Sequence, residues 1–116
     1  MMIWPDGLRV YLACGVTDMR KSIDTLAVLA AEQLRQDPLS GHLFGFCNRK
    51  RDTVKLLYWD RNGFCLWHKR LERDRFHWPD SESEVRLIST RELHWLLDGL
   101  SVEQAAHGSL SYEKIC

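Results

Sequence analysis

Three strand-like runs follow one another across short turns, and this spacing limits the fold more than any other feature of the sequence. The runs cover residues 43–47, 53–59 and 64–71, and each is rich in apolar and aromatic residues. Turn residues separate them at 48–52 and at 60–63, where Asn62-Gly63 readily supplies the positive φ angles of a tight turn. Because parallel neighbours need a long crossover, the runs predict antiparallel pairing.

Weaker signals add further strands and two helices. Runs at 8–13 and 75–78 predict additional strands, and 85–88 is compatible with one at the sheet edge. Apolar residues at three- and four-residue spacing predict a helix from Thr17 or Asp18 to Gln36. Ser89 and Glu92 have the spacing of a capping box, so a second helix is expected to begin there and to end at Gly99.

The predicted fold class is α+β. We expect an antiparallel β-meander of about five strands, with one long helix packed on the sheet and a shorter C-terminal helix. A chain of 116 residues is long enough for one hydrophobic core. Residues 1–100 are therefore expected to form a single domain, and 101–116, with Gly108 and several serines, a weakly ordered tail.

Composition excludes several classes of protein. The longest apolar run, at 26–31, has six residues, far fewer than the ~20 that cross a bilayer, so no membrane partner is expected. The N-terminus lacks the features of a secretory signal, which predicts a cytoplasmic protein. The four cysteines are widely spaced, so we expect reduced thiols rather than disulfides, and neither a metal nor another cofactor.

Positive charge is concentrated in the middle of the chain. The formal net charge is zero, yet residues 42–78 contain nine Lys or Arg and four acids, a net of +5. Basic side chains beside flat aromatic rings suit phosphate contact and base stacking. Alternatively, the cations protect exposed strands and the tryptophans belong to the core.

The basic residues of the meander are the main candidates for nucleic-acid contact. Arg49, Lys50 and Arg51 are predicted at one hairpin tip and Arg61 at the other. A three-residue loop at Asn62-Gly63 would place four further candidates on one sheet face, whereas a two-residue loop would change their partners. These four are Lys55, Trp59, Trp67 and Lys69, and Arg70 completes the set.

Two candidates lie outside the meander. Arg20 and Lys21 are predicted in the first helical turn, where exposed amides favour an anion, so they are expected to bind a phosphate or an acidic partner residue. The alternative is an ion pair of Arg20 with Asp18 or Asp24. Trp95 lies off the leucine stripe of the second helix and is a candidate anchor for a protein partner.

The sequence offers no convincing catalytic set. The acids of the meander are few, and two of them lie at turns. Ser89 is explained as a helix cap, and Cys65 and His68 lie three residues apart on one strand, which puts them on opposite faces. We therefore expect a protein that is not an enzyme.

Several motifs in a fixed order resemble one family, the small second-reading-frame proteins, often called TnpB, of insertion sequence 66 elements. Residues 14–24 are similar to the family signature G-x-TDMRKG-F-D, with Ser22 in place of glycine and Ile23 in place of phenylalanine. The resemblance covers about residues 3–100. Its other motifs are 37–44, 49–52, 59–66, 69–72 and 76–79.

The resemblance implies an accessory protein in transposition, encoded beside a separate and larger transposase. Under this interpretation the chain contacts element DNA, the transposase or both. The alternative is a protein-interaction adaptor of the transposase without DNA contact, and self-association into a homo-oligomer is left open.

Overall fold

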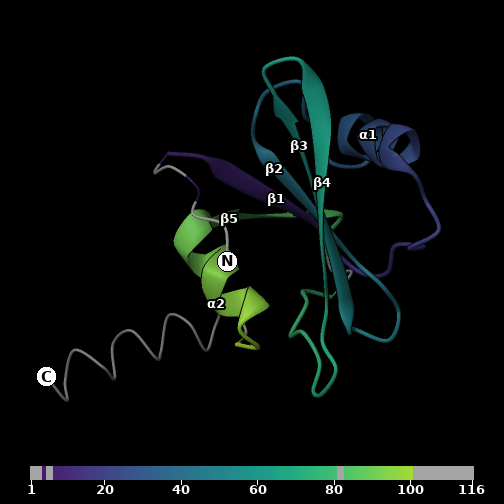
Figure 1. Ribbon diagram of the computed structural model, residues 1–116, viewed down its shortest axis with the longest axis vertical. Coiled ribbons are helices and arrows are strands. Elements are labelled where there is room, and N and C mark those ends of the chain that lie inside the picture. Colours follow the sequence, from purple (N-terminus) through teal and green to yellow (C-terminus); the bar gives the residue numbers. More distant parts are fainter. Residues whose placement is uncertain (1–3, 5–6, 81–82, 101–116) are drawn as a thin grey trace, which may run out of the picture.

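A computed structural model describes residues 4, 7–80 and 83–100 and shows one sheet with helices on both of its faces (Figure 1). Within this part of the chain the strands lie in the order β4-β3-β2-β1-β5. The elements in chain order are β1 (Arg9–Ala13), α1 (Ile23–Glu32), β2 (Leu43–Cys47), β3 (Thr53–Asp60), β4 (Gly63–Arg70), β5 (Val85–Ser89) and α2 (Thr90–Leu97).

The sheet is mixed, so the predicted antiparallel meander is wrong. β1 and β2 run parallel, with Val10 opposite Leu43, whereas β2–β3, β3–β4 and β1–β5 are antiparallel. The connection from β1 to β2 contains α1 and is long enough for the crossover that a parallel pair requires. The short turns of the sequence therefore predicted only the part of the sheet formed by β2, β3 and β4.

The first helix is shorter than predicted. α1 has ten residues and begins after Ser22, whose backbone is extended, so the expected long helix from Thr17 or Asp18 to Gln36 is wrong. The amide of Thr17 donates to the carbonyl of Cys47 at 2.8 Å, which ties this stretch to the end of β2 instead of to a helical turn. The second helix has the predicted capping box between Ser89 and Glu92.

Each helix covers one face of the sheet (Figure 1). Leu26, Ala30 and Leu34 pack against Phe44 and Leu57 on one face. Leu93, Leu96 and Leu97 of α2 belong to the cluster on the opposite face. That cluster also contains Val10, Leu12, Leu56, Phe76 and Trp78.

The segment after β4 forms no strand, so the prediction at 75–78 is wrong. Phe76 and Trp78 are buried in the cluster that contains the leucines of α2, whereas Arg75 and His77 are exposed, so the alternation arises without strand pairing. The amide of Phe76 donates to the carbonyl of Arg51, and the indole N–H of Trp78 donates to the carbonyl of Ala13 at 2.8 Å. The segment is thus fixed by the core and by single hydrogen bonds rather than by a ladder.

The turn between β3 and β4 has two residues, because Asp60 pairs with Gly63. The positive φ angle falls on Arg61, at 51°, and not on Asn62 or Gly63 as expected. This register places Lys55 opposite His68 and Val54 opposite Lys69.

Candidate nucleic-acid interface

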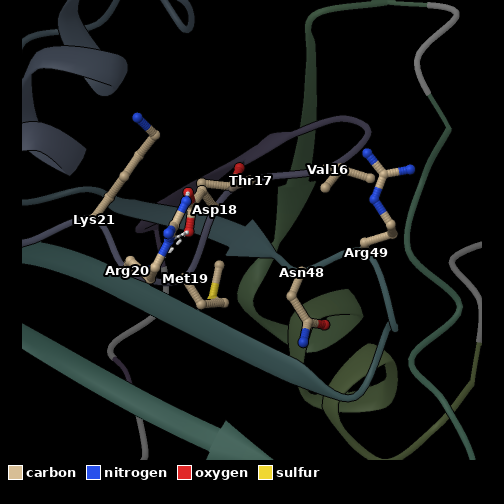
Figure 2. Close-up of a pocket in the computed structure, with 8 residues that line it drawn as sticks. All are labelled: Val16, Thr17, Asp18, Met19, Arg20, Lys21, Asn48 and Arg49. Carbon is tan, nitrogen blue, oxygen red and sulfur yellow. Dashed lines mark hydrogen bonds and ion pairs between the residues drawn. The ribbon is translucent and has the colours of Figure 1, made fainter.

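The candidate site lies where the parallel strands β1 and β2 end. A pocket of about 620 Å³, here called the carboxyl-end pocket, is lined by residues 16–21, which follow β1, and by Asn48 and Arg49, which follow β2 (Figure 2). In open sheets that contain parallel strands, ligands bind outside the carboxyl ends of these strands. Its position therefore makes this pocket the first place to look for a ligand.

Hydrogen bonds fix the loop that forms one wall of the pocket. Gly15 has a φ of 83°, which favours glycine, and its amide donates to the carbonyl of Pro79 at 3.1 Å. Further along the loop, the ammonium of Lys55 donates to the carbonyl of Met19 at 2.7 Å. The loop is thus attached to β2, to β3 and to the segment after β4, and it presents Arg20 and Lys21 in a defined place.

Asp18 and Arg20 form the main ion pair of the pocket (Figure 2). The Arg20 guanidinium donates from Nε and Nη2 to the carboxylate at 3.1 and 2.7 Å, and the Arg20 amide donates to Asp18 Oδ1 at 2.9 Å. These bonds to Arg20 lower the pKa of Asp18 to about 2. Of the two acids considered as partners of Arg20, the structure pairs it with Asp18. Asp24 is not on the same helical turn as Arg20, because α1 begins only at Ile23.

The opposite wall belongs to the turn between β2 and β3. Asn48 organises this turn, since its Oδ1 accepts from the amides of Asp52 and Thr53 and its Nδ2 donates to Asp52 Oδ1 at 2.7 Å. The side-chain hydrogen bond from Asn48 is the largest contribution to the lowered pKa of Asp52. Arg49 and Lys50 are left exposed at the tip.

The pocket carries a net positive charge. Arg20, Lys21 and Arg49 contribute three cations and Asp18 one carboxylate, which leaves +2. Within the described part of the chain, Lys21, Arg49 and Lys50 form no ion pair. In Figure 2 the side chains of Lys21 and Arg49 extend from opposite sides of the pocket. The two basic segments of the sequence are therefore neighbours in space.

Several of the predicted contact residues have partners within the protein. Arg51 donates to the carbonyl of Trp78 at 2.9 Å and pairs with Asp80. Lys69 donates to the carbonyl of Leu97, in the last turn of α2, where a cation is favoured by the helix dipole. The ammonium of Lys55 donates to the carbonyl of Met19. The remaining pair, Arg70 with Glu72, lies at the surface.

The predicted face of lysines and tryptophans does not form. With the two-residue turn, Lys55 and Trp59 lie on the α1 face, whereas Trp67 and Lys69 lie on the α2 face. The rings of Trp59 and Phe64 meet edge to face at 5.1 Å, and those of Trp67 and Trp4 at 6.2 Å. Arg61 lies at the other end of β3, far from the pocket.

Trp95 is half-buried on α2, and the guanidinium of Arg91 lies 5.1 Å from the centre of its ring. Arg91 and Trp95 therefore form a partly exposed aromatic and cationic surface on α2.

Sequence reasoning did not identify Val16, Thr17, Asp18 or Asn48 as residues of the site. The available signal was the long connection between β1 and β2, which contains a helix and therefore suits a parallel crossover. Recognising that crossover would have placed the loops after both strands at one edge of the sheet.

The described residues contain no group of three or more His, Cys, Asp or Glu suited to a metal ion. Among these residues Cys14, Cys47 and Cys65 are free thiols, and burial raises the pKa of Cys47 to about 12. None of the described helices is long and apolar enough to cross a membrane. The predicted tail over 101–116 lies outside the described residues.

Comparison with known proteins gives relatives and a family. Two proteins of Sinorhizobium fredii (strain NBRC 101917 / NGR234) are similar. Uncharacterized protein y4hO is 42% identical over 93 residues, 80% of this chain and 81% of its own length. Uncharacterized protein y4jC is 33% identical over 100 residues, 85% of this chain and 86% of its own length. No solved structure matches.

The family comparison confirms the resemblance drawn from the motifs. The model described as IS66 Orf2 like protein matches residues 8–107, which is most of the chain. This chain therefore belongs to the IS66 Orf2-like family.

Proposed function

We propose that this protein is a non-catalytic accessory factor in the transposition of an insertion sequence, and that it contacts DNA through the carboxyl-end pocket and the adjoining tip at Arg49 and Lys50. Family membership supports the accessory role, because the IS66 Orf2-like proteins are accessory proteins rather than known enzymes. One observation carries the DNA contact: cations from two separate segments line the same pocket.

The chemistry of these cations suits a phosphate backbone. Lys21, Arg49 and Lys50 are free of ion pairs within the described residues, so their charges are available to a ligand. Phosphate contacts position a protein on DNA without reading its sequence. Contact through these three cations would give a slope of log K against log salt of about −2.7, since each neutralised phosphate contributes roughly −0.9.

Under this proposal the separate transposase supplies the chemistry of strand cutting and joining. The acids nearest to the pocket have structural partners: Asp18 binds Arg20, and Asp52 accepts from Asn48 and Thr53. Two-metal phosphoryl transfer needs carboxylates gathered around the ions. The partnerships of these two acids instead support a role in shaping loops.

The test is a titration of the purified protein with a labelled duplex from the element end and with an unrelated duplex of equal length, over a range of salt. The triple variant Lys21→Gln, Arg49→Gln, Lys50→Gln is expected to bind more weakly and to reduce the magnitude of the slope by about 2.7. Arg61→Gln is the matched control, because eight residues of β3 place Arg61 roughly 25 Å from the tip.

Failure of the wild-type protein to bind either duplex at low salt, alone and with the transposase, would contradict the proposed DNA contact. An equal loss in the triple variant and in Arg61→Gln would show that the contact is not centred on the pocket.

A second candidate function is a protein-interaction adaptor of the transposase without DNA contact. The surface of Trp95 and Arg91 favours it, because tryptophan and arginine are enriched at interaction hot spots. Co-purification with the transposase that survives nuclease treatment, is lost in Trp95→Ala and persists in the triple variant would support this function over DNA contact.

A further inference from the structure

We infer that the contact with duplex DNA continues from the carboxyl-end pocket onto the loop at residues 72–75, so that Arg73 and Arg75 bind phosphates of the same backbone. This inference rests on the proposed function and extends it to a second loop. The ligand it commits to is an extended polyanion, the backbone of duplex DNA, rather than a free phosphate.

The loop is held directly beside the basic tip. Its two ends are hydrogen-bonded to the turn between β2 and β3, since the amide of Leu71 donates to the carbonyl of Asp52 and the amide of Phe76 to the carbonyl of Arg51, both at 2.7 Å. Buried Phe76 and the side-chain bond from Arg51 to Trp78 anchor the far end. The loop is therefore fixed next to Arg49 and Lys50 although it has no regular structure.

The charges of the loop are available to a ligand. Arg73 and Arg75 are exposed and form no ion pair within the described residues. Of the acids nearby, Glu72 pairs with Arg70 and Asp80 pairs with Arg51. Together with Lys21, Arg49 and Lys50, the two arginines make five cations that form no ion pair within the described residues. Of the acids beside them, Asp52 accepts hydrogen bonds from Asn48 and Thr53, and Asp74 forms no ion pair within the same residues.

A second pocket explains why the ligand should be a polymer. It has a volume of about 520 Å³, lies between the loop and the end of α2, and is lined by Arg73 and Arg75 together with Asp74 and Asp98. Two carboxylates offset two guanidinium groups, so the pocket has little net attraction for a small anion. A polyanion gains its binding from many cations at once and can touch the arginines while it follows the adjoining tip.

The test compares the salt dependence of duplex binding for the wild type, for Arg73→Gln with Arg75→Gln, and for the control Arg61→Gln. Loss of two phosphate contacts reduces the magnitude of the slope by about 1.8, so that between about 50 and about 200 mM salt the wild type loses roughly tenfold more affinity than the double variant. Inorganic phosphate at millimolar concentration is expected not to displace the duplex. Circular dichroism melts check that each variant is folded.

The outcomes separate this inference from the proposed function. Binding by the wild type with the same slope in the double variant overturns the inference and leaves the contact at the carboxyl-end pocket standing. A wild type that binds no duplex overturns both. Displacement of the duplex by millimolar phosphate overturns the choice of a polymer as the ligand.

Discussion

Gly45 lies in the centre of β2, where the structure has no room for a side chain. A Cβ atom built on Gly45 would lie 2.7 Å from Leu12 Cδ2, 3.1 Å from Trp78 Cη2 and 3.3 Å from Leu56 Cδ2. These neighbours have little freedom to move, because Leu12 and Leu56 are fully buried and the indole of Trp78 is hydrogen-bonded to Ala13. Gly45→Ala is therefore an overpacking substitution, and such changes cost about 1–3 kcal/mol.

Thermal unfolding followed by circular dichroism measures this cost. For a domain of about this size, each 1 kcal/mol lowers Tm by about 4–8 °C, so we expect a decrease of roughly 5 to 20 °C. Gly63→Ala is the matched control, since a Cβ there meets nothing within 4 Å and the residue lacks a positive φ. Leu12→Val, which removes the closest methyl group, should cost less in the Gly45→Ala background than in the wild type. Equal Tm values for Gly45→Ala and Gly63→Ala would refute the packing argument.

Four further predictions concern the pocket and its surroundings. Asp18→Asn removes the carboxylate that occupies Arg20, so affinity for duplex DNA near 0.1 M salt should rise by about eightfold, the gain from one more phosphate contact. Arg20→Gln removes the guanidinium that binds Asp18, so the pKa of Asp18, measured by NMR, should rise from about 2 toward 3.8. Lys55→Met removes the bond to Met19 and should weaken duplex binding without changing the salt slope, whereas a slope reduced by about 0.9 would mean that Lys55 touches a phosphate. Cys47 is buried with a pKa raised to about 12, so it should resist alkylation at pH 8 in the native protein and react after unfolding, and rapid native labelling would contradict its burial.

Local patterns predicted the parts of the fold that depend on neighbouring residues. The hairpin of β3 and β4 and the capping box of α2 involve groups only a few residues apart, so sequence spacing defines them. The parallel pairing of β1 with β2 depends on which strands meet in space, and no short pattern encodes that choice. The run at 75–78 was predicted as a strand, but the structure buries Phe76 and Trp78 without strand pairing.

The candidate site was predictable in its residues more than in its arrangement. Arg20 and Lys21 were identified from a helical first turn that the structure does not have, and Arg49 from the basic hairpin tip. Only the crossover brings the three residues to one pocket. The face expected for Lys55 and Trp67 depended on one residue of turn length, and a two-residue turn separates them across the sheet. Lys69 was assigned to nucleic-acid contact because the sequence does not show that its ammonium donates to the carbonyl of Leu97, at 3.0 Å.

The pairing of β1 with β5 has a consequence for synthesis of the protein. Arg9 lies opposite Ser89 and Ala13 opposite Val85, so the first of the described strands to be synthesised pairs with the last of them. Until β5 has been synthesised, β1 has an unpaired edge, and Val10 and Leu12 lack the leucines of α2 that cover them in the folded protein. Contacts between such distant residues slow folding and prolong exposure of apolar surface. The nascent chain should therefore remain protease-sensitive until residues through Leu97 have emerged, and stalled chains that end before Val85 should be those that chaperones retain.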